Sequence, residues 1–342
     1  MRLLIWGASP LGGWLAARLH HSQHEVTWLA DTPTNASLTR ALVLVTGQTH
    51  QKIEGLRILT DPREALKPLP DWVIFAMPGW GLGRAVTQLA MTAAPEKLPY
   101  VLSLQPGIGS LEKLTSLLGA EKSLRVVITR QFTWADVTHQ SILMGISGGF
   151  VVSEHPQSAL VGKLLQQAGL GSPHTAPVES LGWSDVFWRL HANALPSLLN
   201  ISPAAVYTDP ALWEIEYRQL REAIAVIDRL NISLVKLPGV NVPRLAWQVR
   251  LLPPRWLART LKRRVGLPSL RDDLEQQSGH SDAAYLNGAV AQAAYGLQLS
   301  AAVNHVLALS LTDVGEGRVQ WSHYHNNLDY LQTLIRVASR HV

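Results

Sequence analysis

A glycine cluster near the start of the chain has residue types and spacing that indicate chemistry. It reads Gly7-Ala8-Ser9-Pro10-Leu11-Gly12 and lies between an apolar run at residues 3–7 and a helical pattern at residues 11–21. A strand that enters a glycine turn and opens a helix presents backbone N–H groups and the positive end of the helix dipole, which together bind a pyrophosphate. The spacing fits G-x-G-x-x-G with Ser9 at the middle glycine, where a hydroxyl can itself bond phosphate. We therefore predict a dinucleotide site at these six residues.

Asp31 is the predicted ribose ligand of the same site. It follows a second apolar run, residues 25–29, and lies roughly 20 residues beyond the turn, where an acidic side chain accepts from the ribose 2′-OH. A carboxylate there repels a 2′-phosphate, so we expect NAD in preference to NADP, with both cofactors left open. Two alternatives compete: Asp31 as an ordinary turn residue, and the apolar start as a signal peptide. Glycines and a proline interrupt that start, which favours the pocket.

The wider pattern predicts the elements that must position this turn. Apolar strand candidates separated by helical stretches indicate an α/β domain with a parallel sheet covered on both faces. Beyond about residue 183 the pattern is helical throughout. We predict a Rossmann-type dinucleotide-binding domain at residues 1–178, followed by an all-helical domain at residues 179–342. The strand candidates are residues 3–7, 25–29, 41–47, 56–61, 71–78, 100–107, 124–132 and 148–154.

Composition excludes several classes of function. The chain has no cysteine, so it has no disulfide, thiolate metal site or cysteine nucleophile, which fits a cytoplasmic protein. Its net charge of +5 is too modest to indicate nucleic acid. No window has the 18 or so apolar residues of a membrane span. The histidines lack metal-ligand spacing, so no metal is expected. The basic run at residues 244–264 includes Trp247 and Trp256; we expect a solvated face or subunit contact there, with an anionic membrane or nucleic acid as alternatives.

Several further motifs in the sequence resemble those of one known protein family. Together with the glycine turn, they resemble the ketopantoate reductase (2-dehydropantoate 2-reductase) family over most of the chain. The resemblance implies a reductase that acts on a small 2-oxo acid with a nicotinamide cofactor. The motifs are LQPGIG at residues 104–109, LLQQAGL at 164–170, FWRLHANALPS at 187–197, LPSLRDDLE at 267–275 and SDAAYLNGAVAQAAYGLQLSAAVN at 281–304.

The resemblance also implies site residues in the helical domain. Arg189 stands at the position of the family's lysine, its general acid, and Asn193 and Ser197 follow at substrate-holding positions. Because these three residues are four apart, we expect them on one face of a single helix. The family's later serine corresponds to Ser269. Its glutamate, which contacts substrate and cofactor, corresponds to Asp282.

This sequence departs from the family pattern at the predicted reaction centre. Arg189 replaces a lysine, and a guanidinium polarises a carbonyl or clamps a carboxylate but is a poor acid. Pro78 and Pro106 replace a lysine and an asparagine at positions that we assign to the cofactor site. Asp282 is one methylene shorter than the family's glutamate. The resemblance therefore predicts a family member with an altered reaction centre.

Two functions from different classes remain open. The first is an NAD(P)-dependent reductase of a small 2-oxo acid, with a homodimer as one option. The alternative is a catalytically silent protein that binds NAD(H) or a metabolite on the same scaffold. His191 could supply a proton, but a packing histidine is the favoured interpretation. Arg189 has an alternative role as an ion-pair partner of Asp185, four residues before it.

Overall fold

The computed structural model describes residues 1–30, 42–136, 140–261, 269–275 and 279–340. The chain forms two compact units. Unit 1 comprises Met1–Gln105, Ser110–Leu181 and Leu237–Val240, and unit 2 comprises Pro106–Gly109, Gly182–Lys236 and Asn241–Val342. The division into domains at residue 178 stays a prediction.

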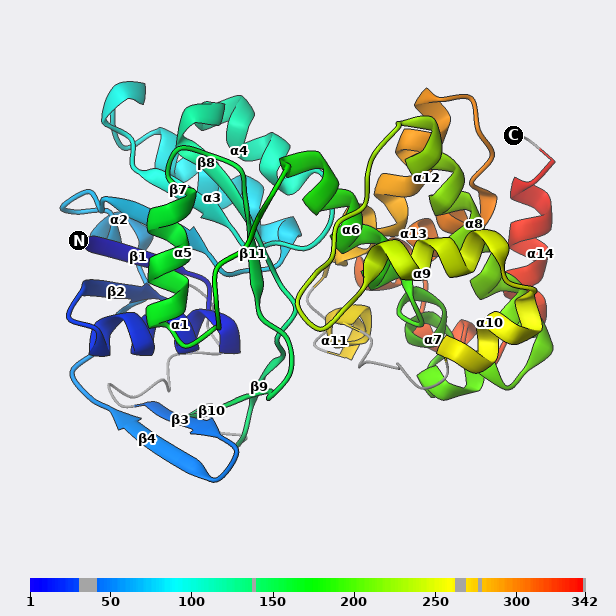
Figure 1. Cartoon of the computed structure of the whole chain (residues 1–342), viewed down its shortest axis with the longest axis horizontal. Helices are drawn as coiled ribbons and strands as arrows, with labels where there is room; N and C mark the ends of the chain where they lie inside the picture. Colours follow the sequence, from blue (N-terminus) through cyan, green and yellow to red (C-terminus); the bar gives the residue numbers. More distant parts are fainter. Residues whose placement is uncertain (31–41, 137–139, 262–268, 276–278, 341–342) are drawn as a thin grey trace. The chain divides into compact units, whose positions relative to one another are not determined.

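Unit 1 is built on an eight-stranded sheet whose strand order changes direction at its centre (Figure 1). The chain leaves β1 for β2 and β5 on one side, and then crosses to β6, β7 and β8 on the other side, all parallel. β11 is antiparallel to β8. This is the doubly wound order, in which ligands bind beyond the carboxyl ends of the strands at the switch point. In sheet order the strands are β12 (Thr175–Ala176), β11 (Phe150–Ser153), β8 (Ser123–Ile128), β7 (Tyr100–Ser103), β6 (Trp72–Phe75), β1 (Arg2–Trp6), β2 (Glu25–Leu29) and β5 (Arg57–Leu59).

Both faces of this sheet are covered, which explains the continuous apolar strands. Leu3 and Ile5 of β1 belong to one hydrophobic core, while Leu4 and Trp6 belong to a second. Residues of α1 and α5 complete the first core, and residues of α3 and α4 complete the second. Alternate side chains of a strand point to opposite faces, so all four buried positions of β1, residues 3–6, must be apolar. The helices of unit 1 are α1 (Pro10–His21), α2 (Pro62–Ala65), α3 (Gly79–Ala90), α4 (Ser110–Leu118) and α5 (Ser158–Gln167), with 3-10 turns η2 (Pro95–Lys97) and η3 (Ala120–Lys122).

A second, four-stranded sheet packs against α1. Its order is β4 (Thr49–Ile53), β3 (Leu42–Thr46), β10 (Ser141–Met144) and β9 (Phe132–Trp134). We expected residues 41–47 to extend the parallel sheet, and this is wrong, because β3 pairs with β4 in an antiparallel hairpin. Gly13 of α1 permits the close approach, since a Cβ there would lie 2.7 Å from the Ile142 side chain.

Unit 2 is all-helical among its described residues. Its helices are α6 (Val178–Leu190, whose first turn belongs to unit 1), α7 (Ala194–Leu199), α8 (Pro210–Arg229), α9 (Val242–Leu251), α10 (Pro254–Leu261), α11 (Ser269–Glu275), α12 (Asn287–Gly296), α13 (Ala302–Gly315) and α14 (Leu328–Ala338), with 3-10 turns η4 (Pro203–Tyr207), η6 (Asp282–Tyr285) and η7 (Trp321–His323). The fold class that we predicted is confirmed.

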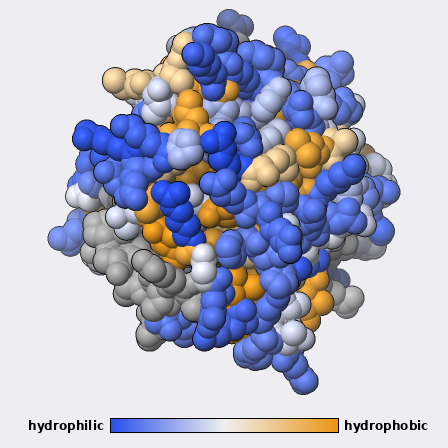
Figure 2. Space-filling model, turned by 90° about the vertical axis from the view of Figure 1, so that its left-hand side faces the viewer, coloured by the Kyte–Doolittle hydropathy of each residue, from blue (hydrophilic) through white to orange (hydrophobic). Residues whose placement is uncertain are grey.

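Two surface properties follow from the described residues. None of their helices combines the length and the apolar character that crossing a membrane requires. Figure 2 shows a mainly hydrophilic face, with hydrophobic side chains visible in recesses between polar ones. In the basic run, Trp247 and Trp256 are both more than half exposed.

Candidate functional site

The glycine turn of unit 1 lies between β1 and α1, at the switch point of the sheet. Gly7 has φ of +127°, and a Cβ there would lie 2.5 Å from the carbonyl oxygen of Ala76, just beyond β6. A Cβ on Gly12 would lie 2.4 Å from the Gly7 carbonyl oxygen. Only glycine fits both positions without displacing backbone. The turn therefore has the shape that a dinucleotide-binding turn requires.

Ser9 caps α1 and is held inside the turn. Its hydroxyl accepts from the Gly12 N–H at 3.1 Å and donates to the Ala76 carbonyl at 2.6 Å. We expected this hydroxyl to be available to a phosphate; instead it is engaged within the protein. Pro10, at the first helical position, has no N–H, and the Gly13 N–H bonds the Ser9 carbonyl. Within the first helical turn, Leu11 thus supplies the principal remaining backbone donor for a phosphate. Ala8, which precedes Ser9, is half-buried.

Two neighbouring strand ends complete the arrangement in unit 1. Pro78 is the N-cap residue of α3, three residues beyond the end of β6, and makes no side-chain capping bond. Buried Gln105, beyond β7, donates to the carbonyls of Phe75 and Met77 at 2.9 and 3.0 Å, and so ties the ends of β6 and β7 together. Asp31, the predicted ribose ligand, lies outside the described residues.

In unit 2, Arg189 is held by a buried carboxylate. Its Nε donates to Asp185 Oδ1 at 2.7 Å, and Asp185 is 1% exposed. The other oxygen of Asp185 accepts from the Gly107 N–H at 3.1 Å, so Pro106 and Gly107 lie beside α6. Gly107 has φ of +79°, and its place under the Tyr285 carbonyl, 2.0 Å from a would-be Cβ, excludes a side chain. The ion pair between Arg189 and Asp185 that the spacing suggested is therefore present.

The helix that carries Arg189 breaks directly after it. α6 ends at Leu190, α7 begins at Ala194, and Ala192 between them has φ of +46°. The expected single helix face for Arg189, Asn193 and Ser197 is therefore wrong. A non-glycine residue in the left-handed region is strained and persists only where surrounding contacts hold it.

A buried pair on α8 supplies those contacts. Glu216 accepts from the Ala192 N–H at 2.6 Å and from Gln219 Nε2 at 2.7 Å, and Gln219 Nε2 also donates to the Leu190 carbonyl at 3.0 Å. These bonds satisfy backbone groups that the helix break would leave unpaired. Burial raises the pKa of Glu216 to about 8, against the opposing effect of its two hydrogen bonds. This pair was not predicted from the sequence, although Glu216 falls on the apolar stripe between Leu212 and Leu220, a position where a carboxylate is unusual.

Asn193 joins the break to α11. Its Nδ2 donates to the Arg189 carbonyl at 2.9 Å and to Ser269 Oγ at 3.1 Å, and its Oδ1 accepts from the Leu270 N–H at 3.1 Å. With both N–H groups used, Asn193 orients Ser269 and is poorly placed to bind substrate directly. Ser197 is fully buried, and the structure gives no support to its predicted contact with substrate.

Asp282 lies in η6, next to a second carboxylate. Its backbone N–H donates to Asp273 Oδ2 at 2.8 Å. Burial, and then repulsion from Asp282, raise the pKa of Asp273 to about 7. Asp273 therefore keeps its proton up to about neutral pH.

The described residues show where His191 lies and which side chains gather near one another. His191 is 8% exposed and bonds the Tyr207 hydroxyl at 2.7 Å, as expected of a packing histidine. Among the described residues, no group of three or more His, Asp or Glu side chains is arranged to hold a metal ion.

Comparison with known proteins identifies the two parts of the chain. The family model "Ketopantoate reductase PanE/ApbA" matches residues 3–157, and "Ketopantoate reductase PanE/ApbA C terminal" matches residues 178–313. No curated protein matches the chain.

Solved structures of the same fold cover almost the whole chain. A PanE/ApbA family ketopantoate reductase from Ralstonia eutropha JMP134 is 21% identical with a TM-score of 0.75, and the match covers 93% of this chain and 99% of that one. A 2-dehydropantoate 2-reductase from Geobacter metallireducens GS-15 is 17% identical with a TM-score of 0.72, covering 91% and 99%. A D-mandelate dehydrogenase in complex with NADH is 16% identical with a TM-score of 0.70, covering 94% and 100%. At these identities the likeness shows the fold alone.

Proposed function

Because the chain belongs to the PanE/ApbA ketopantoate reductase family of oxidoreductases, we propose that it is an NAD(P)H-dependent reductase of small 2-oxo acids with an altered reaction centre. The observation that carries this proposal is the placement of Arg189 by buried Asp185, which also fixes Gly107. An arginine held in one orientation is suited to a planar carboxylate or a carbonyl oxygen.

The residues of unit 1 fit a dinucleotide cofactor. The glycine turn stands at the switch point of a doubly wound sheet, and its tight packing at Gly7 and Gly12 supports the binding of a pyrophosphate across it. When bound, the cofactor supplies a hydride for the carbonyl carbon. Asp31 supports a preference for NADH. We also assign Pro78 and Pro106 to the cofactor site, although neither has a polar side chain.

We assign substrate binding and proton transfer to residues of unit 2. We assign Arg189 to the binding or polarisation of the substrate. Ser269 receives a hydrogen bond from Asn193, which leaves its own O–H group to donate to substrate. Asp282 is assigned to the substrate hydroxyl or the cofactor. Since arginine is a poor acid, Asp273, whose pKa is raised by burial and by repulsion from Asp282, is the stronger candidate to hold the proton that ketone reduction consumes.

The substrate class that we propose is a small 2-oxo acid, and two subclasses deserve separate tests. The family points to branched aliphatic acids such as ketopantoate. The fold shared with a D-mandelate dehydrogenase, which acts on an aromatic 2-hydroxy acid, supports aromatic acids such as phenylglyoxylate.

A second candidate function is a silent NAD(H)-binding protein. The loss of polar side chains at Pro78 and Pro106, and the engagement of the Ser9 hydroxyl within the turn, favour it. It differs from the reductase in turnover and not in cofactor binding.

One assay separates the two functions. The loss of NADH and NADPH absorbance at 340 nm (the characteristic band of a reduced nicotinamide) is followed with ketopantoate, phenylglyoxylate and several aliphatic 2-oxo acids, while cofactor binding is measured in parallel. Turnover with any of them, abolished in Arg189→Ala, supports the reductase. Tight binding of NADH without turnover across the panel supports the silent protein. Failure to bind either cofactor contradicts both.

A further inference from the structure

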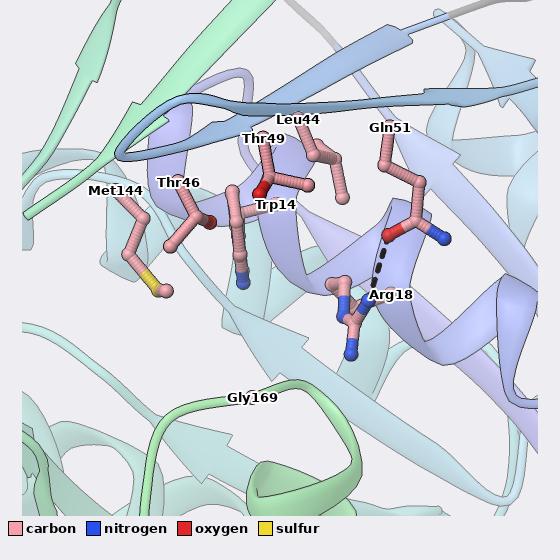
Figure 3. A pocket seen from close by; sticks show the side chains of 8 residues that line it. All are labelled: Trp14, Arg18, Leu44, Thr46, Thr49, Gln51, Met144 and Gly169. Carbon is pink, nitrogen blue, oxygen red and sulfur yellow. Dashed lines mark hydrogen bonds between the residues drawn. The ribbon is translucent and has the colours of Figure 1, made fainter.

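Unit 1 contains a pocket of about 290 Å³ beside α1, beyond the first turn of that helix. Trp14 and Arg18 lie four and eight residues beyond Pro10, so at 1.5 Å per residue they are roughly 6 and 12 Å along the helix from its start. Figure 3 shows their side chains facing those of the hairpin of β3 and β4. The complete lining is Trp14, Arg18, Leu44, Thr46, Thr49, Gln51, Met144 and Gly169.

The lining has an apolar part with a fixed shape. Trp14 is 3% exposed, and its Nε1 donates to the Ala168 carbonyl at 2.9 Å, which locks the indole ring in place. Leu44 and Met144 are also buried. An aromatic ring beside a thioether and an aliphatic side chain provides the surface that an apolar or aromatic ligand body prefers.

The polar part of the lining has a positive charge that no carboxylate among the described residues pairs with. Arg18 Nη1 donates to Gln51 Oε1 at 2.8 Å, and its buried Nε has no hydrogen-bond partner. Within the described part of the chain, Arg18 forms no ion pair. Arg189 of unit 2, by contrast, is paired with a buried carboxylate.

A second arginine adds to this charge. Arg130 donates to the Gly169 carbonyl at 3.4 Å and to the sulfur of Met144 at 3.5 Å, both of them lining residues. Its Nε is likewise buried without a partner, and in the described residues it too lacks a carboxylate. Two half-buried guanidinium groups next to one cavity create a positive potential, because their charges are only partly screened by water.

From these contacts we propose that the pocket is a second binding site for a small organic carboxylate with an apolar or aromatic body. The carboxylate binds Arg18, whose planar group suits it, and Thr46 and Thr49 line the same cavity. The body packs against Trp14. The volume is close to the lower end of known small-molecule sites, about 300 Å³, which limits the ligand to roughly one ring. The glycine turn and Arg189 take no part in this site.

Benzoate is a suitable probe, with benzamide as its neutral analogue and acetate as the carboxylate without a body. The readout is the indole N–H resonance of Trp14 in ¹⁵N-labelled protein, assigned with Trp14→Phe. For a ligand of this size we expect a dissociation constant of about 1 mM. Benzamide and acetate should bind at least about tenfold more weakly, since each lacks one of the two interactions.

Three arginine variants locate the binding. Arg18→Met should weaken benzoate at least about tenfold, as the charge-assisted contact is lost. Arg84→Met, on an exposed position of α3, and Arg189→Met should stay within about twofold of the parent protein. Thr49→Trp, which fills the cavity from an exposed hairpin position, provides a second test should Arg18→Met fail to fold.

Each outcome decides the proposal. It is supported by saturable shifts of the Trp14 signal that Arg18→Met or Thr49→Trp abolishes and Arg189→Met preserves. It is overturned by the absence of a saturable shift up to 20 mM benzoate, by equal binding of benzamide, or by binding that depends on Arg189 and not on Arg18.

Discussion

The two turns on which the proposed chemistry depends are built in opposite ways. The turn between β1 and α1 in unit 1 is formed by residues that lack a side chain: Gly7 and Gly12 leave space for the backbone of their neighbours. The turn between α6 and α7 in unit 2 has an alanine at φ of +46° and is held by side chains from a distant helix, chiefly Glu216. The conformation of the first turn is determined by the residues of the turn itself. A turn of the second kind depends on tertiary contacts that contain titratable groups.

The largest effect should come from Arg189, which the second turn positions. Arg189→Ala should lower kcat/KM by about a hundredfold, since removing a charge-assisted contact typically costs a few kcal/mol. The affinity for NADH should hardly change, because we assign the dinucleotide mainly to the glycine turn. Steady-state kinetics and a binding titration on the same protein test both statements. A variant with full reductase activity would show that Arg189 carries no chemistry.

Arg189→Lys sharpens the same test. Lysine restores the family's proton donor, and its pKa can fall towards neutrality on burial, while that of arginine cannot. If the protein is a degenerate ketopantoate reductase, the lysine should raise ketopantoate reduction above that of the parent. If Arg189 serves a specialised substrate, lysine should lower the native activity, because a point charge does not replace a planar fork.

The pH dependence of the free energy of unfolding should distinguish the second turn, which contains a titratable group, from the first. The pKa of Glu216 is about 8 in the folded protein and about 4.5 when unfolded, so the folded state holds its proton over that interval. The stabilising contribution is complete below pH 4.5 and is lost as the pH rises through 8. Glu216→Gln should therefore reduce the fall in the free energy of unfolding between pH 5 and pH 8, by about 2–4 kcal/mol.

Urea unfolding at both pH values measures this change. The control is Asp273→Asn, which removes a different raised pKa, of about 7, and leaves the Ala192 turn intact. An unchanged pH dependence in Glu216→Gln would mean that its carboxyl group is ionised in the folded protein throughout the interval.

The same contrast, between local residues and distant contacts, decides which parts of the structure could be predicted from the sequence. The glycine turn, the doubly wound sheet and the helical second half follow from local spacing, since Gly7 and the strand periods act through the backbone beside them. The break after Leu190 could not be predicted, because FWRLHANALPS is a good helical pattern and the opposing contact comes from Glu216, 24 residues from Ala192. The second sheet was missed for a related reason: the strands of β3 and β10 pair across nearly a hundred residues of chain.

The preference for NADH over NADPH tests one assignment in unit 1, that of Asp31 to the ribose, which depends on a single side chain. With Asp31 at the ribose, NADH should bind about tenfold more tightly than NADPH, because the carboxylate repels a 2′-phosphate. Quenching of tryptophan fluorescence during titration with each cofactor measures the ratio. Asp31→Ala should bring the two affinities together. Tighter binding of NADPH by the parent protein would remove Asp31 from the site.

The smallest effect is expected at Ser9, the one residue of the first turn that acts through its side chain. Ser9→Ala removes the cap of α1 and should destabilise the protein by about 1 kcal/mol, whereas Ser9→Gly, also accepted at a cap, should cost only a few tenths. Ser9→Gly also completes G-x-G-x-x-G and releases the Gly12 N–H, so it should tighten NADH binding by about threefold. Thermal unfolding and the NADH titration measure the two effects separately. If the hydroxyl left the Ala76 carbonyl to bind phosphate, Ser9→Gly would weaken NADH binding instead, and the first turn would depend on a side chain as the second one does.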